Sequence, residues 1–339
     1  MQVYLPGAGW IDFDPARSSP QNLAILQAFI PSEGDAWSFT LAGLARFLGT
    51  ARKSPEPARL PRRPLVELAG EQEPDQVAVK HFGDYLAAAG LLGRRVAELH
   101  LALLKGTDDP EFMPEPWSAQ ERRAAHASML DLLSTVFDLL TNRLASLPDD
   151  LRAQAEAVLA GRPRIAARFD EFFKRQPQML RMRCHGDLHL GQVLYTGKDF
   201  VIIDFEGEPA RPLSERRCKR TALHDVAGML RSFHYAAIAA VLEQRRGSLP
   251  DHAEAAATTR WASFWQTWSS WAFLRAYLQT MGATPSLPTS RADLRVALDA
   301  LLIEKAVYEV GYELNNRPEW LGVPLQGISQ ILDVGSTAA

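Results

Sequence analysis

Acid and amide side chains between Cys184 and Pro209, in the sequence CHGDLHLGQVLYTGKDFVIIDFEGEP, have a spacing that suits phosphoryl transfer. This reaction needs a carboxylate that orients the attacking hydroxyl, and oxygen ligands that hold magnesium against the phosphates. Asp187 is placed for the first task. Gln192 and Asp204 carry the hard oxygen ligands that magnesium prefers. The segment therefore predicts the catalytic half of a phosphotransferase site.

Two short runs rich in β-branched and aromatic residues, 192–195 and 200–203, flank the turn residues 196–199. This pattern predicts a β-hairpin. Pairing of the two strands would bring Gln192 and Asp204 back to the same end of the hairpin. The hairpin would thus convert a separation along the sequence into shared metal coordination.

A second chemistry competes for the same residues. Gly186 to His189 also fits the Asp-x-His metal motif of a dinuclear phosphoesterase, with His185 as a further ligand. That chemistry needs further Asn/His and His-x-His ligand groups downstream. The later histidines, His224, His234 and His252, stand isolated. The ordered set of residues therefore favours phosphoryl transfer.

Apolar residues recur at helical spacing along most of the chain, which predicts a mostly α fold. The expected helices cover residues 75–104, 118–147, 149–173, 223–244, 252–280 and 290–315. Trp261, Trp265, Trp268 and Trp271 line up at the same spacing. Because aromatic side chains bury a large apolar area, we expect this stripe to be core, with a sugar platform as the alternative.

The composition limits the class of partner. The 339-residue chain is 47% hydrophobic and 23% charged, which is enough for one large or two smaller globular domains. A net charge of −3 gives no electrostatic basis for binding nucleic acid or an anionic membrane, so we expect a small-molecule partner. The sequence lacks the pattern of an export signal, and Cys184 and Cys218 are expected to be reduced thiols in a soluble, cytoplasmic protein.

Three longer motifs carry a resemblance to a known family: HGDLHLGQVL, DFEGEPARPLSERRCKRTALHDVAGMLRSFHYAA and LLIEKAVYEVGYELNNRPEWL. Over residues 23–331 the chain resembles maltokinase, the maltose 1-phosphotransferase of the aminoglycoside phosphotransferase and protein-kinase-like superfamily. The resemblance implies the C-terminal lobe of a protein-kinase-like fold, with a small β-hairpin at the catalytic loop. It also implies ATP and Mg²⁺ as cofactors, and maltose as the substrate that is converted to maltose 1-phosphate.

Carried over by position, the resemblance makes Asp187 the catalytic base and Gln192 and Asp204 the metal ligands. His185 matches the residue that supports the catalytic loop. His185 and His189 are equally consistent with satisfied structural histidines.

The resemblance also implicates residues in binding the sugar. Glu206, in the motif DFEGEP, would contact sugar or metal. Lys305, Tyr312 and Trp320 would bind the disaccharide by stacking and hydrogen bonding, with Asn316 nearby. Lys305 and Tyr312 lie seven positions apart, on one face of an expected helix.

A kinase of this type needs a second lobe, with strands that carry a glycine-rich cover and a lysine for the phosphates. No GxGxxG or GxxxxGK[ST] pattern precedes the hinge-like segment 29–44. Lys53 lies in a proline-rich loop and Lys80 in an expected helix, so neither has the strand context that the role requires. The nucleotide lobe of maltokinases is therefore expected to be absent from this sequence.

Residues 3–16, VYLPGAGWIDFDPA, instead resemble the end of a bacterial transglutaminase-like domain, in which Asp14 matches the acid of a Cys-His-Asp triad. No Cys or His precedes residue 81, so no triad can be assembled there. We expect a gene fusion, a truncation or a misassigned start.

Four parts are expected along the chain. They are a transglutaminase-like remnant or extension (1–20), a hinge-like segment with the first helix (21–50), a Pro/Arg-rich loop (51–75) and the helical kinase-like lobe (76–333). A kinase of this kind would need a separate nucleotide lobe, or trehalose synthase, as its partner. The alternative is a catalytically dead lobe that binds sugar or serves as a scaffold.

Overall fold

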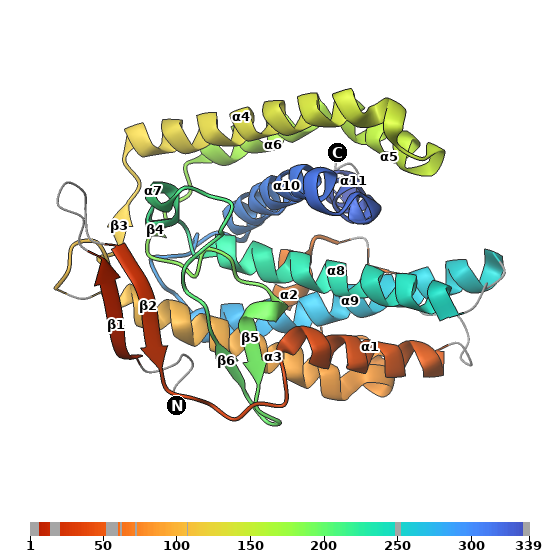
Figure 1. Cartoon of the computed structure of the whole chain (residues 1–339), viewed down its shortest axis with the longest axis horizontal. Helices are drawn as coiled ribbons and strands as arrows, with labels where there is room; N and C mark the ends of the chain where they lie inside the picture. The colour runs from red at the N-terminus through yellow and green to blue at the C-terminus, as the bar shows by residue number, and fades with distance from the viewer. Residues whose placement is uncertain are drawn as a thin grey trace.

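The computed structural model describes residues 7–13, 21–51, 60–61, 63–71, 73–106, 108–247 and 252–334. The chain is mostly helical, as the periodicity predicts (Figure 1). The α-helices are α1 (Ala36–Ala51), α2 (Leu65–Glu71), α3 (Gln76–Leu104), α4 (Ala119–Arg143), α5 (Asp149–Ala160), α6 (Arg162–Arg175), α7 (Leu213–Arg216), α8 (Leu223–Gly247), α9 (His252–Met281), α10 (Arg291–Asn316) and α11 (Gly322–Val334). Asp14 and most of the proline-rich stretch 53–64 lie outside the described residues.

Short strands pair in antiparallel twos within the described residues. The pairs are β1 (Gly7–Phe13) with β2 (Gln21–Gln27), β3 (Glu115–Pro116) with β4 (Leu180–Arg181), and β5 (Val193–Tyr195) with β6 (Phe200–Ile202). Short 3₁₀ helices lie at η1 (Leu144–Ser146), η2 (Leu190–Gln192) and η3 (Pro318–Trp320).

The structure divides one predicted helix into two. Residues 149–173 form α5 and α6, which meet at Gly161. Pro163 lies in the first turn of α6, where its missing N–H costs nothing, whereas in a continuous helix it would remove a hydrogen bond. The other long helices lie close to their predicted positions. A further helix, α2, interrupts the segment 51–75, for which the sequence predicts a loop.

Helices α8, α9 and α10 form the centre of the fold, with α1 and α3 on one side and α4 and α6 on the other (Figure 1). α3 packs along α9, while α10 packs against α8, α4 and α6. No helix within the described residues is long and apolar enough to cross a membrane.

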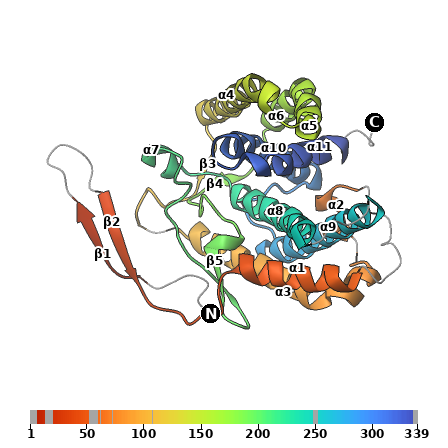
Figure 2. The ribbon, with the colours of Figure 1, turned by 45° about the vertical axis from the view of Figure 1, so that its right-hand side comes forward.

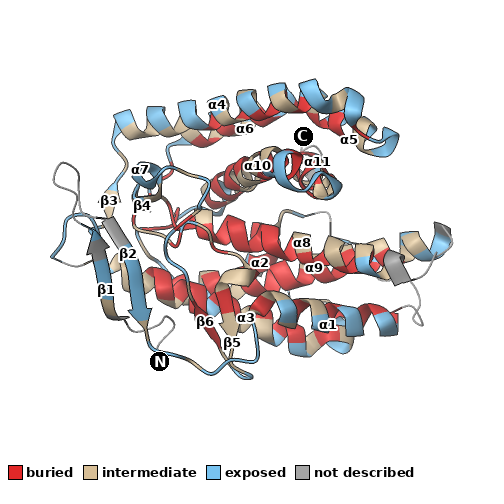
Figure 3. Cartoon of the chain, in the orientation of Figure 1, coloured by how far each residue is buried: buried red, intermediate tan, exposed pale blue. Residues whose placement is uncertain are grey.

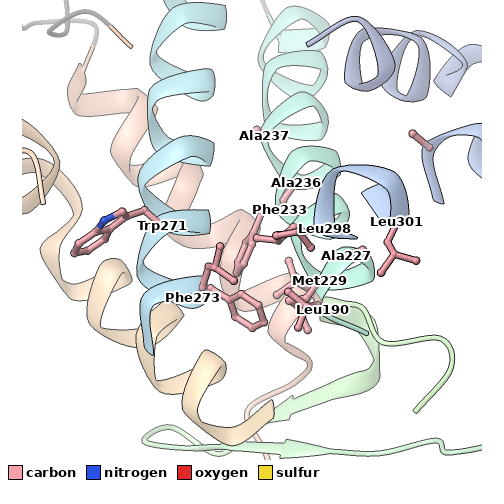
Figure 4. Close-up of a cluster of buried hydrophobic side chains, with 14 of the residues drawn as sticks. Leu190, Ala227, Met229, Phe233, Ala236, Ala237, Trp271, Phe273, Leu298 and Leu301 are labelled. Carbon is pink, nitrogen blue, oxygen red and sulfur yellow. The ribbon is translucent and has the colours of Figure 1, made fainter. Parts of the chain in front are cut away.

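The buried residues gather where the central helices meet, as the red parts of the ribbon in Figure 3 show. Figure 4 shows Phe233 of α8, Phe273 of α9 and Leu298 of α10 in one cluster, beside Leu190 from the start of η2. Each of these four side chains is at most 1% exposed. The catalytic-loop segment is therefore built directly onto the core.

The tryptophan stripe of α9 is buried. Trp261, Trp265, Trp268 and Trp271 are exposed by no more than 6% each. The prediction that these residues belong to the core is confirmed, and the alternative of a sugar platform is wrong.

The close packing of α3 against α9 depends on a glycine. A Cβ atom at Gly93 would lie 2.2 Å from the carbonyl oxygen of Phe273, so α9 would have to move. We expect Gly93→Ala to lower the free energy of unfolding by about 1–3 kcal/mol, because overpacking forces backbone shifts. Gly49→Ala in α1 is the matched control: nothing lies within 4 Å of its Cβ position, and it should stabilise by about 0.5–1 kcal/mol. Urea denaturation measures both, and a Gly93→Ala variant as stable as the control would contradict this explanation.

The hairpin of β1 and β2 projects from the helical body (Figure 2). It joins residues on both sides of the boundary that the sequence predicts at residue 20. Its large apolar side chains are exposed, among them Trp10 at 71% and Leu26 at 65%.

Candidate active site

The predicted hairpin at the catalytic segment is confirmed. β5 and β6 pair from Val193 opposite Ile202 to Tyr195 opposite Phe200, and the Ile203 N–H donates to the Gln192 carbonyl over 3.0 Å. The amide nitrogen of Gln192 donates to Asp204 Oδ2 over 2.9 Å. The hairpin thus brings the two predicted metal ligands together.

The far end of this hairpin is fastened to the core by Arg95 of α3. The Arg95 side chain is only 6% exposed, and it donates from Nε to Asp199 Oδ1 over 2.7 Å and from Nη2 to Asp199 Oδ2 over 3.2 Å. On the other edge, the hinge-like segment pairs with Tyr195. The Glu33 N–H donates to the Tyr195 carbonyl, and the Tyr195 N–H donates to the Gly34 carbonyl. The two predicted metal ligands therefore stand on a hairpin held from both sides.

The catalytic loop is anchored by Asp225 of α8, a residue that the sequence did not single out. Asp225 accepts from the backbone N–H of His185 over 2.8 Å and from that of Gly186 over 2.9 Å. His100 Nε2 lies 3.0 Å from Asp225 Oδ2. Burial alone would raise the pKa of Asp225, but the hydrogen bond and charge of His100, with the other loop contacts, lower it to about 2. A buried carboxylate is therefore held ionised beneath the loop.

His185 is buried and supports the loop through both ring nitrogens. Nε2 lies 2.8 Å from the carbonyl oxygen of Ile203, which can only accept, so Nε2 carries the proton. Nδ1 accepts from the backbone N–H of Asp187 over 3.3 Å. The ring thus ties the strand that leads to Asp204 to the residue proposed as the base.

Asp187 lies beside Lys305 and Glu208. Lys305 Nζ is 3.6 Å from Asp187 Oδ1 and 3.4 Å from Glu208 Oε2, so the ammonium group bridges the two carboxylates. Burial raises the pKa of Asp187 to about 6, with Lys305 opposing the shift and Glu208 adding to it. The pKa of Glu208 is lowered, because Lys305 and its hydrogen bonds outweigh burial. Asp187 is therefore the member of the pair that titrates just below neutral pH.

The bridging ammonium gives a testable shift. We expect Lys305→Met to raise the pKa of Asp187 above about 6, since the charge that opposes burial and Glu208 is removed. The carboxyl ¹³C resonance of Asp187, followed by NMR against pH, measures the change. Lys198→Met, at the exposed hairpin turn, is the control and should leave the titration unchanged. A pKa that stays the same or falls in Lys305→Met would rule out this electrostatic assignment.

His189 faces Asp187 with a neutral ring. Its Nδ1 accepts from the Gly191 N–H over 3.0 Å, and its Nε2 is 3.9 Å from Asp187 Oδ2. Burial, together with the charge of Lys305, lowers the pKa of His189 to about 4. The ring therefore stays uncharged at neutral pH and caps η2.

A cleft of about 780 Å³ opens beside Asp187, between α8, α10 and the hinge-like segment. Lys305 and Tyr312 line it, as the resemblance implies. Asp35 and Trp37 contribute from the hinge-like segment, which the sequence did not assign to a site. The cleft is large enough to hold a small sugar with its reacting hydroxyl toward Asp187.

An ion pair fixes a further carboxylate at the cleft wall. Arg231 is 4% exposed and donates to Glu309 Oε2 from Nε over 2.8 Å and from Nη2 over 2.6 Å. Its Nη1 lies 2.8 Å from His234 Nδ1. Burial and the charge of Arg231 hold the pKa of His234 well below its usual range, so this ring accepts. Glu309 was missed by the sequence reasoning, because its partner lies 78 positions away.

Trp320 is not among the described residues that line the cleft. It stacks on Tyr235, with ring centroids 6.2 Å apart, and Tyr235 does line the cleft. The Tyr235 hydroxyl donates to Glu313 Oε1 over 2.9 Å, and Arg317 pairs with both oxygens of Glu313. The tryptophan therefore supports the cleft wall from behind.

Glu206 and Glu208 point to different sides of their loop. Gly207 between them has φ +76°, a conformation that glycine adopts without strain and that turns the chain. Glu206 is largely exposed, and its Oε2 lies 3.9 Å from Arg216 Nη1. Glu208 is the one that lines the cleft. The geometry therefore favours Glu208 over the predicted Glu206 as the acidic sugar contact.

The donor set of Gln192 and Asp204 fits a magnesium ion. Asp204 is exposed and has φ +64°, an uncommon conformation outside glycine that aims its carboxylate at Gln192. Magnesium usually takes one or two protein ligands and completes its shell with water and substrate phosphates. No cluster of three or more His, Cys, Asp or Glu with metal-site geometry exists in the described part of the chain.

The chain was compared with known proteins. No family model matches it. It is 29% identical over 283 residues to a glucosamine kinase of Mycolicibacterium smegmatis, covering 80% of this chain and 59% of that protein. It is 25% identical over 317 residues to a glucosamine kinase of Streptacidiphilus jiangxiensis, covering 93% of this chain and again 59% of the relative. The chain thus spans about 59% of the length of these relatives.

Solved structures of glucosamine kinase have a similar fold. One, in complex with glucosamine, ADP and inorganic phosphate, superposes with a TM-score of 0.66 at 24% identity, covering 98% of this chain and 65% of that chain. Another, in a different crystal form, has a TM-score of 0.67 at 22% identity. At these identities the likeness establishes a shared kinase-like fold.

Proposed function

We propose that the site transfers the γ-phosphoryl group of ATP to a hydroxyl of a sugar bound in the cleft. The observation that carries this proposal is the position of Asp187, which lies at the cleft wall beside Lys305 and Glu208. The similarity of the chain to glucosamine kinases supports phosphoryl transfer to a sugar.

In this proposal the acceptor hydroxyl binds against Asp187, which is ionised above about pH 6 and takes the hydroxyl proton. Lys305 holds the Asp187 carboxylate in place and limits the charge that the two carboxylates present to the incoming phosphate. Gln192 and Asp204 would hold Mg²⁺, which neutralises charge on the phosphates. His185 and Asp225 keep the loop in register with the hairpin.

For the acceptor we propose maltose, on the basis of the motifs around DFEGEP and ELNNRPEWL, and test it against glucosamine, the sugar named for the relatives. ADP release from Mg-ATP should be measured with maltose, glucosamine and glucose, each over a range of concentrations. The proposal expects the highest kcat/KM with maltose. A higher kcat/KM with glucosamine would refute maltose and keep the sugar kinase, whereas no turnover with any sugar would refute both.

Sugar binding without phosphoryl transfer is a second candidate function. It is favoured by the absence of any lysine on the strands that the structure describes. The acceptor cleft, by contrast, has polar and aromatic side chains along its wall. Calorimetry with Mg-ATP separates the candidates, since micromolar nucleotide binding excludes this second one. We also propose a nucleotide lobe on a separate chain, or trehalose synthase, as a partner. Co-purification of this chain with the candidate protein is the test.

A further inference from the structure

A small cavity beside the catalytic loop is lined by arginines. It has a volume of about 20 Å³, room for about one water molecule, and lies next to Gly186, the residue before Asp187. The arginines around it are Arg183, Arg211, Arg216 and Arg220. Glu208 lines both this cavity and the acceptor cleft, whereas none of the four arginines lines the cleft.

The hydrogen-bonding capacity of these guanidinium groups is incompletely used. The Nε atoms of Arg183 and Arg216 are buried and have no hydrogen-bond partner among the described residues. Arg211 comes within 3.6 Å of Glu215 and Arg216 within 3.9 Å of Glu206, both longer than a hydrogen bond. Because buried donors in proteins are normally paired, these two Nε atoms are available to an acceptor that binds in the cavity.

Arginines outnumber carboxylates in the lining of the cavity, although Arg183 also pairs with Glu111 outside it, over 3.4 Å. Two carboxylates, Glu208 and Glu215, line it together with the four arginines, and Glu208 already pairs with Lys305 over 3.4 Å. Burial lowers the pKa of Arg220, and the nearby charge of Arg211 lowers it further, although Glu304 opposes this. An anion placed among the guanidinium groups would relieve both the repulsion and the unused donors.

The cavity joins two segments that matter for the site. Arg220 is held by paired backbone hydrogen bonds, 2.8 and 2.9 Å long, with Met182, which follows β4 and precedes the Asp187 loop. Arg211 and Arg216 belong to the segment that follows Asp204 and Glu208. A Cβ atom on Gly186 would lie 3.4 Å from Gly207 Cα, so the loop and this segment already touch at the cavity.

We propose that this cavity is a binding site for a phosphoryl oxyanion, either inorganic phosphate or the phosphate group of a sugar phosphate. One oxygen enters the cavity, and the others meet Arg211 and Arg216 at its mouth. The bound anion ties the segment 207–217 to the catalytic loop and so fixes Glu208 beside Asp187. Binding needs neither nucleotide nor acceptor sugar, so the site is independent of the proposed function.

The test is isothermal titration of the full chain with potassium phosphate, and separately with glucose 1-phosphate, at constant ionic strength. EDTA in the buffer prevents phosphate from binding through a metal ion at Asp204. We expect one binding site, weakened about tenfold or more in Arg211→Gln and in Arg220→Gln, since each removes charge-assisted hydrogen bonds. Binding of either ligand, or of both, supports the proposal and identifies the source of the anion.

Arg217→Gln is the matched control, because its exposed side chain lies in the same segment outside the cavity lining. It should bind phosphate as the wild type does. Arg216→Gln, whose side chain is 23% exposed, gives a second variant should Arg220→Gln fail to fold by circular dichroism. No binding by the wild type at millimolar phosphate, equal weakening in Arg217→Gln, or equally tight binding of chloride would each overturn the proposal.

Discussion

Replacing Asp187 by asparagine is expected to lower sugar-dependent ADP release by about 10²- to 10⁴-fold, because an amide cannot take the acceptor proton. The same variant should be more stable than the wild type at neutral pH. The folded protein raises the pKa of Asp187 to about 6 from an ordinary value of 3.8, so the ionised side chain costs stability above pH 6. This cost is absent below about pH 4, where the carboxyl is protonated in both states.

Initial rates and urea denaturation at pH 7.5 and pH 4 measure the two effects. Asp84→Asn on the exposed face of α3 is the control for the loss of one carboxylate. It should change neither the rate of ADP release nor the free energy of unfolding. Substantial turnover in Asp187→Asn would remove this residue from the role of base. A stability gain that persists unchanged at pH 4 would show that the pKa of Asp187 is not its cause.

The second large effect is expected at Asp225. Asp225→Asn should lower the free energy of unfolding by about 3 kcal/mol at pH 7, because the amide turns an N–H group toward donors that the carboxylate accepted from. It should also lower turnover, since the backbone of His185 and Gly186 loses its anchor. The effect on stability does not depend on nucleotide or sugar.

The pH dependence of this effect has a defined sign. The folded protein lowers the pKa of Asp225 to about 2 from an ordinary 3.8, so its contribution to stability is present above about pH 4 and is lost as the pH falls toward 2. Urea denaturation between pH 7 and pH 2.5 should show the wild type and Asp225→Asn converging. Asp138→Asn, exposed on α4, is the control and should differ little from the wild type throughout. Parallel curves that never converge would contradict this pKa assignment.

The parts of the site that lie close in the sequence could be predicted from it. Gln192 and Asp204 are 12 positions apart, and a turn between two strand-like runs was enough to bring them together. Asp187 followed from its place before this hairpin. The helices could likewise be predicted, because their apolar spacing is a local property, except where Gly161 and Pro163 divide one of them.

The parts that depend on tertiary packing could not be predicted. Asp225 reaches the loop across 40 positions, His100 reaches Asp225 across 125, and no local pattern marks either residue as part of this anchor. The choice of Glu208 over Glu206 is made by the turn at Gly207, which the sequence alone leaves open. Trp320 was expected at the sugar, but its stacking on Tyr235 places it behind the wall.

The central proposal is phosphoryl transfer from ATP to a sugar at Asp187, and ³¹P NMR of the reaction mixture tests it most directly. The chain should be incubated with Mg-ATP and either maltose or glucosamine, with Asp187→Asn in parallel. We predict a new phosphomonoester resonance that grows together with the resonances of ADP, requires the sugar and is absent from the variant. Spectra in which ATP persists, or in which only inorganic phosphate and ADP accumulate, would contradict the proposal.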